Sequence, residues 1–286
     1  MAAGLRAGWE EGALSYQDLT LRNRGYIAPE LQEKIRSTRL LVAGCGLGSV
    51  AAEVAVRTGF ERFVLVDGDD IAAHNLNRQS YAAADIGRPK VEALAERLRA
   101  VNPGAQVETL KSWVNAGNAA DLTGRAGLVL DTIDFLDLPA IVELHDAARR
   151  RGLTVVSAFS AGWGAVAAVF SPKSATLRSL CGLPEEGSVE GASYPQAFGR
   201  LLAGMAGSLP PEFVAVTRET LKGMADGRPC PAPQLAAGAF CTASLMVTLA
   251  VSVLAGRKVA EAPRMVLADT SGLAAGPGML VSGPRA

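Results

Sequence analysis

Short apolar runs alternate with amphipathic segments over most of the chain. Most of the runs have the length, about 4–8 residues, and the Val, Leu and Ala content of strands buried inside a sheet. Strands that alternate with helices predict an α/β fold with a mainly parallel sheet flanked by helices. The strands are predicted at residues 40–43, 63–66, 106–110, 128–130, 154–157, 163–170 and 264–267, and the helices at residues 50–58, 90–101 and 140–151.

The segments around this core have a different pattern. Residues 1 to about 20 are rich in Ala and Gly and are expected to be poorly ordered, whereas residues 29–35 predict a helix that begins near a proline. Residues 172–233 hold many prolines and glycines, which predicts a long crossover with short helices near residues 194–206 and 211–224. This divides the chain into an N-terminal arm (1–38), a core (39–172) and, in the same domain, a crossover with a C-terminal helix-strand extension (173–286) and a loose tail (276–286).

One stretch, residues 235–255, is long and apolar enough to span a bilayer. It is rich in Ala, Gly, Ser and Thr, and it lacks the dense Leu, Ile and Phe content of a membrane helix. We therefore expect a helix buried in the core or at a dimer interface, and no membrane partner.

Composition and charge narrow the class of protein further. The 286 residues carry 28 basic and 28 acidic side chains without a basic block, so no nucleic-acid partner is expected. The four cysteines are widely spaced and form no C-x-x-C pair, which argues against a disulfide framework and for a reducing, cytoplasmic location. Charged residues such as Arg6 and Glu10 interrupt any apolar run at the N-terminus, so no signal peptide is expected.

The first predicted strand runs directly into a glycine-rich turn, Gly44, Gly46 and Gly48. Glycines allow the backbone to approach a ligand, and the N–H groups of the following helix point at that ligand, usually a phosphate. The next strand ends in Asp67, about 20 residues later, where a carboxylate can bind ribose hydroxyls in a Rossmann-like fold. Ser49 stands where the G-x-G-x-x-G pattern has its third glycine, so this signal alone fits either a nucleotide site or a turn shaped by packing.

The polar residues after this aspartate favour a triphosphate as the ligand. Asn75, Arg78 and Lys90 follow the strand end. A guanidinium and an ammonium can neutralise and orient a triphosphate, whereas hydride transfer does not need them here. Ordinary surface charges are the alternative interpretation.

Five motifs then occur in a fixed order: V-D-G-D at 66–69, N-L-N-R-Q at 75–79, G-R-P-K at 87–90, N-P at 102–103 and D-T-I-D at 131–134. With them, residues 22–172 resemble the adenylation domain of ubiquitin-activating enzymes and of their bacterial relatives, the ThiF, MoeB and HesA adenylyltransferases that activate sulfur-carrier proteins. The resemblance implies an enzyme that uses ATP and Mg²⁺ to convert a carboxylate to an acyl-AMP with release of pyrophosphate. It also implies a homodimer in which an arm arginine, Arg24 or else Arg22, reaches the partner's site; a solvated charge is the alternative.

Adenylation depends mainly on positioning and charge neutralisation. Arg78 and Lys90 would neutralise the β- and γ-phosphate oxygens, and Asp134 would hold Mg²⁺, which favours few carboxylates together with phosphate and water. These aspartates have structural alternatives, since Asp67 and Asp69 could cap a turn and Asp134 a helix. The candidate catalytic residues are Arg78, Lys90, Asp134 and Arg24, and the candidate nucleotide-binding residues are Gly44, Gly46, Gly48, Asp67, Asp69, Asn75, Arg78 and Lys90.

The chain also departs from the family pattern. It lacks the C-x-x-C pairs that bind structural zinc in bacterial relatives, so no zinc is expected, and it lacks the arginine that follows Asp134 in them. The acceptor is therefore open: the C-terminus of a ubiquitin-like or sulfur-carrier protein, a peptide, or a small acid. Cys181 in the crossover either receives the acyl group as a thioester or is an ordinary loop cysteine. His145, within a predicted helix, is expected to be structural.

Two other functions compete with adenylation. The glycine turn with Asp67 also fits a nicotinamide- or flavin-dependent oxidoreductase, although Arg78 and Lys90 would then have no task. A non-catalytic nucleotide-binding partner subunit is favoured mildly by the missing arginine after Asp134. Fold alone does not choose among them.

Overall fold

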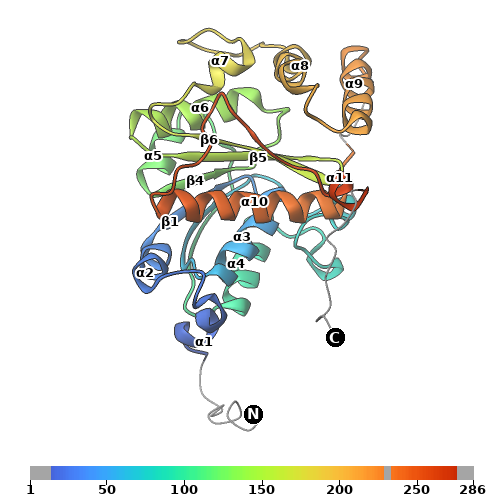
Figure 1. Cartoon of the computed structure of the whole chain (residues 1–286). Coiled ribbons are helices and arrows are strands. Elements are labelled where there is room, and N and C mark those ends of the chain that lie inside the picture. Colours follow the sequence, from blue (N-terminus) through green and yellow to red (C-terminus); the bar gives the residue numbers. More distant parts are fainter. Residues whose placement is uncertain (1–13, 229–232, 276–286) are drawn as a thin grey trace, which may run out of the picture.

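The computed structural model describes residues 14–228 and 233–275, and the predicted tail at 276–286 lies outside them. Seven strands within these ranges form one sheet in the order β3-β2-β1-β4-β5-β6-β7 (Figure 1). Strands β1 to β5 pair in parallel, and β6 and β7 add antiparallel, so the predicted α/β fold with a mainly parallel sheet is confirmed. The strands are β1 (Arg39–Ala43), β2 (Arg62–Val66), β3 (Gln106–Leu110), β4 (Leu128–Asp131), β5 (Val155–Ala161), β6 (Gly164–Phe170) and β7 (Val266–Ala268).

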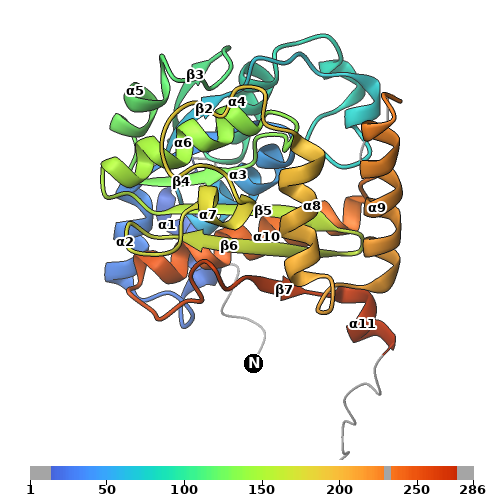
Figure 2. The same ribbon diagram turned by 90° about the horizontal axis from the view of Figure 1, so that it is seen from above.

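Helices cover both faces of the sheet. Figure 1 shows α3, α4 and α10 on one face and α5 and α6 on the other, and Figure 2 shows α8 and α9 side by side at one end. The α-helices are α1 (Tyr16–Thr20), α2 (Pro29–Ser37), α3 (Leu47–Thr58), α4 (Lys90–Val101), α5 (Ala119–Gly124), α6 (Leu138–Arg150), α7 (Leu177–Cys181), α8 (Tyr194–Met205), α9 (Pro211–Ala225), α10 (Ala236–Leu254) and α11 (Thr270–Ala275), and the short 3-10 helices span Leu21–Asn23, Ala73–Asn75 and Ala83–Asp85.

The sequence of β1 explains why the sheet is buried on both faces. Leu40 and Val42 belong to the core beside α3, α4 and α10, whereas Leu41 and Ala43 belong to the core beside α5 and α6. Successive side chains of a strand point to opposite faces, so a continuous apolar run is what a doubly covered strand requires.

Helix α10 lies against β5, β6 and α3. Ala239, Ala243, Met246 and Ala250 are fully buried along it, as expected for a core helix. By length and composition, α10 is also the one helix of the described residues that could cross a membrane, and half of it is buried inside the fold.

The predicted poor order up to residue 20 is wrong for its last part. Ser15 caps α1 by accepting a hydrogen bond from the N–H of Asp18. Tyr16 then fastens α1 to the core, since its hydroxyl donates to the carbonyl oxygen of Gly59 over 2.9 Å. Residues 16–20 of the arm therefore form a helix that packs beside α3 and are not poorly ordered.

The order of the strands determines where a ligand can bind. Strand β1 lies between β2 and β4 in the sheet. After β1 the chain continues to β2 and β3 on one side, and it then crosses back to form β4 on the other side. In open parallel sheets the crevice at such a reversal, outside the carboxyl ends of the strands, is the usual ligand site. Gly44 follows β1 at this point, and Thr132 follows β4.

Candidate functional site

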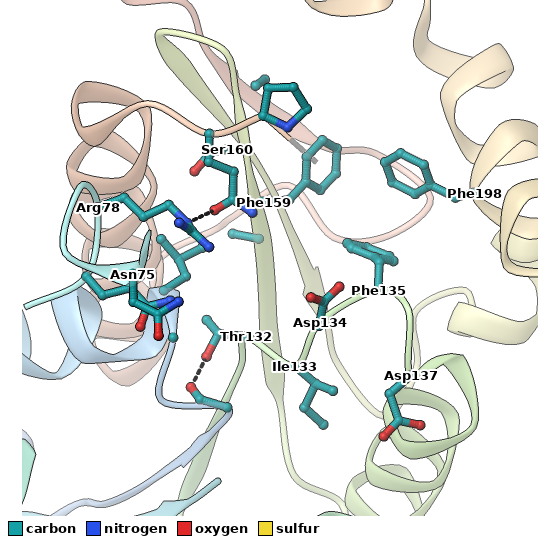
Figure 3. A pocket seen from close by; sticks show the side chains of 18 of the residues that line it. Asn75, Arg78, Thr132, Ile133, Asp134, Phe135, Asp137, Phe159, Ser160 and Phe198 are labelled. Atoms are coloured by element: carbon teal, nitrogen blue, oxygen red, sulfur yellow. Dashed lines mark hydrogen bonds between the residues drawn. The ribbon is translucent and has the colours of Figure 1, made fainter. Parts of the chain in front are cut away.

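A cavity of about 500 Å³ opens at the carboxyl ends of β1, β2 and β4 (Figure 3). Motifs far apart in the sequence meet there, as the pairing of adjacent parallel strands predicts. The candidate residues that line it are Gly44, Gly46, Asp67, Asp69, Asn75, Arg78, Lys90 and Asp134.

The glycine turn is held rigidly between β2 and β4. The N–H of Cys45 donates to Oδ2 of Asp67 over 2.6 Å, and the hydroxyl of Thr132 donates to the carbonyl oxygen of Gly44 over 2.6 Å. Gly48 is not among the lining residues. A Cβ atom there would lie 2.5 Å from Oγ1 of Thr132, so a glycine is needed at this position for helix–strand packing.

Two carboxylates and one ammonium form a compact group beside this turn. Oδ1 of Asp67 accepts from the N–H of Asp69 over 2.8 Å, so both oxygens of Asp67 hold backbone. Nζ of Lys90 lies 2.6 Å from Oδ2 of Asp69 and 3.9 Å from Oδ2 of Asp67. Burial raises the pKa of Asp67, while the nearby Lys90 charge lowers it. The turn-capping interpretation of Asp67 therefore describes a real contact, and the charge of Lys90 is balanced within the chain.

Arg78 is different, because its charge has no carboxylate partner within 4.0 Å among the described residues. Its guanidinium donates to Oε1 of Gln234 over 2.9 Å, to the carbonyl oxygen of His74 over 3.0 Å and to Oδ1 of Asn77 over 2.9 Å, and all three acceptors are neutral. Burial lowers the pKa of Arg78, and the negative charge of Asp134 opposes that effect. A half-buried, positioned guanidinium that faces a cavity is suited to bind an anion such as a carboxylate or a phosphate.

Two amides complete this side of the cavity. Oδ1 of Asn75 accepts from the N–H of Ala72 over 2.9 Å, which leaves its Nδ2 group to donate to a ligand. Gln79 is 8% exposed, and its Oε1 atom has no hydrogen-bond partner. Its Nε2 group lies against the open face of Gly46, 3.2 Å from where a Cβ atom would be.

Asp134 is exposed at the end of β4, across the cavity from Arg78 (Figure 3). One oxygen accepts from the N–H of Leu136 over 3.1 Å, and no cation of the described residues pairs with it. The helix-capping alternative belongs to another residue, since Asp137 caps α6 by accepting from the N–H of Ala140. The described part of the chain contains no cluster of three His, Cys, Asp or Glu side chains that would hold a metal. A metal at Asp134 would therefore need ligands from a bound molecule.

His145 lies beneath the site rather than in it. Its Nε2 atom is 2.9 Å from Oδ2 of Asp131, which also accepts from the hydroxyl of Ser157 over 2.9 Å. The imidazole is buried and packs edge-on against Phe170. These contacts fix the end of β4, in agreement with the structural role expected from the sequence.

The remaining candidates do not line the cavity. Arg22 and Arg24 follow α1, are not in contact with the cavity of their own chain, and could act only on a second copy. Cys181 is 2% exposed at the end of α7, and burial raises its pKa to about 11. Of the two interpretations of Cys181, the burial of its thiol favours an ordinary structural cysteine over a thioester-forming nucleophile.

Sequence reasoning missed the aromatic side of the cavity. Four of the chain's eight phenylalanines line it, together with Tyr194. Trp113 also lines it and covers Gly68, where any side chain would meet the indole ring. No periodic pattern marks these rings, because they come from separate elements. The four phenylalanines are Phe135, Phe159, Phe198 and Phe213.

The chain is similar in sequence to proteins of known family. Residues 20–276 match the profile of the ThiF family. The SAMP-activating enzyme E1 of Haloferax volcanii is 32% identical over 132 residues, 46% of this chain and 48% of that protein. The sulfur carrier protein ThiS adenylyltransferase of Escherichia coli is 31% identical over 148 residues, 51% of this chain and 58% of that protein. The chain thus aligns with about half the length of these curated relatives.

The fold is also that of a solved structure. The E. coli tRNA N6-threonylcarbamoyladenosine dehydratase, crystallised in complex with ATP, superposes with a TM-score of 0.60 at 19% identity. The match covers 84% of this chain and 95% of that one. At this level of identity the likeness establishes a shared fold.

Proposed function

The chain belongs to the ThiF family, and from this premise we propose that it is an ATP-dependent adenylyltransferase that activates a carboxylate. The observation that carries the proposal is the position of Arg78. An arginine without a carboxylate partner among the described residues faces the same cavity as a glycine turn and the Asp67 carboxylate. Phosphate oxygens would supply the missing negative charge. Arg78 has no comparable task in a hydride-transfer enzyme.

In the proposed reaction, one oxygen of the acceptor carboxylate attacks the α-phosphorus of ATP. The bond from the α-phosphorus to the bridging oxygen of the β-phosphate breaks, and pyrophosphate leaves with its electron pair. The glycine turn and Asn75 would hold phosphate oxygens through N–H groups, and Asp67 would bind the ribose hydroxyls. Arg78 would neutralise the leaving pyrophosphate, where charge accumulates in the transition state.

Lys90 needs a rearrangement of its partners to act on phosphate. Its ammonium is 2.6 Å from Asp69 and is almost fully buried. Asp69 is half-exposed on the other side of the pair, so a phosphate can compete with it for the ammonium. We therefore propose that Lys90 neutralises the charge of phosphate from a position beside Asp67 and Asp69, and that it is not a free cation in the absence of a ligand.

The Asp134 carboxylate suits a hard cation that takes its remaining ligands from phosphate and water, as Mg²⁺ does. When bound, Mg²⁺ would lower the charge of the triphosphate. Within the described residues no cluster of three His, Cys, Asp or Glu side chains surrounds Asp134, and its carboxylate oxygens suit Mg²⁺ better than zinc, which favours nitrogen and sulfur ligands. Asp134 would therefore hold the metal through its unpaired oxygen.

The acceptor is a carboxylate, and the relatives suggest its range. Their names describe action on a sulfur-carrier protein or on a modified tRNA. We propose a carboxylate on a small protein, a peptide or a small acid, in a cytoplasmic enzyme that acts as a homodimer. In the dimer, Arg24 or Arg22 of one copy would complete the nucleotide site of the other.

ATP–pyrophosphate exchange tests the function directly. Radiolabel from pyrophosphate should enter ATP only when a suitable carboxylate and Mg²⁺ are present, and candidates include peptides that end in Gly-Gly. Tight binding of NAD or a flavin with no binding of ATP would instead favour an oxidoreductase. ATP binding without exchange across all carboxylates would favour a non-catalytic subunit.

A further inference from the structure

Aromatic rings from four separate elements close one end of the cavity. Phe135 comes from the loop after β4, Phe159 from β5, and Phe213 from α9. Tyr194 and Phe198 come from the first two turns of α8. Because the crossover region supplies three of these rings, its helices α8 and α9 act as a wall of the site. We name these five side chains the ring cluster.

The rings are close enough to form a continuous surface. The centroids of Phe135 and Phe198 are 4.9 Å apart, those of Phe159 and Phe198 are 5.7 Å apart and edge-on, and those of Phe159 and Phe213 are 6.2 Å apart and stacked. Tyr194 stacks on Phe198 with 5.7 Å between centroids. These are the preferred arrangements of packed aromatic pairs. Phe198 is buried, and the other four rings are partly exposed and line the cavity.

The ring cluster is continuous with the charged end of the same cavity. Phe135 directly follows Asp134, and Figure 3 shows Asp134 between the rings and the side of the cavity that carries Arg78 and Asn75. Among the cavity-lining residues of α8 and α9, Glu212 is the one charged side chain, and no cation is present. The two ends therefore differ in chemistry: one carries the Arg78 cation, and the other is mainly aromatic and has no cation among its lining residues from α8 and α9.

We infer that the acceptor carries an apolar, ring-sized group within a few bonds of its carboxylate, and that the ring cluster binds this group. The inference rests on the proposed function, since the carboxylate must lie near Asp134 and Arg78 for adenylation. A small aromatic acid and a peptide with an aromatic last residue share this chemistry. A Gly-Gly tail does not, because it has no side chain to place against the rings.

The physical argument is one of desolvation. An apolar group that leaves water for the ring cluster gains binding free energy in proportion to the area it buries. The last two residues of a Gly-Gly tail bury little apolar area and would leave the rings in contact with water. A hydrophobic pocket distinguishes ligands that differ by a methylene by about tenfold or more, and a phenyl ring is several times larger.

The equilibrium affinity of the protein for carboxylates tests the inference without relying on turnover. The full chain, with Mg²⁺ and a non-hydrolysable ATP analogue, is titrated calorimetrically with propanoate, hexanoate and 3-phenylpropanoate. The peptide arms are two short peptides that are identical except for a C-terminal Phe or a C-terminal Gly-Gly. We expect affinity to rise along the acid series, with 3-phenylpropanoate binding about 10- to 100-fold more tightly than propanoate.

Variants show whether the ring cluster is the binding surface. Phe213→Ala removes a partly buried ring of the cluster. Val216→Asp puts a charge on a cavity-lining residue of α9 that is 40% exposed, so the substitution places the charge outside the buried core. Both should reduce the preference for 3-phenylpropanoate to within about threefold of propanoate. Phe240→Ala is the matched control, since Phe240 is 55% exposed on α10 and does not line the cavity.

Two results would overturn the inference. One is equal affinity for 3-phenylpropanoate and propanoate. The other is tighter binding of the Gly-Gly peptide than of the Phe peptide, unchanged in Phe213→Ala and in Val216→Asp. In either case ATP–pyrophosphate exchange with the Gly-Gly peptide would leave the adenylation proposal standing. A different result would separate the two proposals in the other direction. If the protein binds no ATP but prefers 3-phenylpropanoate, and the two α9 variants lose this preference, the apolar binding surface is supported and adenylation is refuted. Tight binding of both 3-phenylpropanoate and the Phe peptide would support the inference for small aromatic acids and for peptides with an aromatic last residue.

Discussion

Gly44 lies against the backbone of Thr132, so that a Cβ atom on Gly44 would be 2.5 Å from the Thr132 carbonyl oxygen. Its φ of +87° is also in the left-handed region that side chains disfavour. The glycine turn therefore touches the end of β4, the strand that delivers Asp134. Together with the hydrogen bond from the Thr132 hydroxyl to the Gly44 carbonyl oxygen, this contact holds the glycine turn beside the strand end that precedes Asp134.

Gly44→Ala should destabilise the protein by about 3 kcal/mol or more, because the left-handed conformation costs about 1–2 kcal/mol and the overlap with Thr132 adds to it. Gly87→Ala is a matched control: Gly87 has φ of +85° but has no atom within 4 Å of its Cβ position. It should cost about 1–2 kcal/mol. Urea unfolding of the two variants measures the difference, and equal losses would show that the contact with Thr132 relaxes freely.

Arg78→Ala should weaken ATP binding about 10- to 100-fold, because it removes a cavity-lining cation that has no carboxylate partner in the described part of the chain. Arg78→Lys should recover part of this loss, since it restores charge without the planar fork. Calorimetric titration with ATP and Mg²⁺ provides the measurement. Arg57→Ala, on the exposed face of α3, should bind like the wild type. An unchanged affinity in Arg78→Ala would remove the main support for a triphosphate site.

Asp134→Asn should lower ATP–pyrophosphate exchange by about 100-fold or more while ATP still binds within about tenfold of the wild-type affinity. The amide keeps the size of the side chain and its contact with the Leu136 N–H but loses the charge that attracts Mg²⁺. Raising the Mg²⁺ concentration should recover part of the activity. Asp121→Asn, on α5 outside the cavity, is the control. Exchange at the wild-type rate in Asp134→Asn would contradict the metal role.

Much of the fold could be predicted because its elements carry strong local signals. The helix at 90–101 was predicted with the bounds of α4, since apolar residues recur at helical spacing and Asn102-Pro103 ends it. The strand at 63–66 lies within β2, because the apolar run ends in Asp67. The antiparallel direction of β6 was not predicted: Gly164–Phe170 is buried throughout, so its sequence has no alternation that reports its neighbours.

The candidate site could be predicted in part for a similar reason. Arg78 and Asp134 stand in compact motifs, and the parallel sheet brings the ends of β1, β2 and β4 together whatever the rest of the chain does. The ring cluster could not be found in this way. Phe159 and Phe213 are more than 50 residues apart on different elements, and only the packing of α9 beside β5 brings them to 6.2 Å. The one available signal was how few aromatic residues the chain has, which makes four phenylalanines in one cavity informative.

Cys181→Ala should retain exchange activity and any later transfer of the acyl group. At pH 8 a thiol with a pKa of about 11 has about a hundredfold less thiolate than one at the ordinary value of 9.0, and Cys181 is also shielded from solvent. Its alkylation by iodoacetamide should accelerate about tenfold for each pH step of one up to about 11, because the thiolate fraction rises in that proportion. Peptide mass spectrometry follows the rate at this residue. Fast alkylation at pH 8, or loss of acyl transfer in Cys181→Ala, would restore the thioester hypothesis.

The arm arginine makes a prediction that distinguishes action on a partner from action on its own chain. If Arg24 completes the other copy's site, Arg24→Ala and Arg78→Ala should each be inactive as pure dimers. In an equal mixture that exchanges subunits, half the dimers are mixed, and each has one site with both arginines, so about a quarter of wild-type exchange activity should return. Arg22→Ala mixed with Arg78→Ala tests the alternative arginine. A monomeric protein with full activity, or a mixture that stays inactive after subunit exchange, would exclude action on a partner.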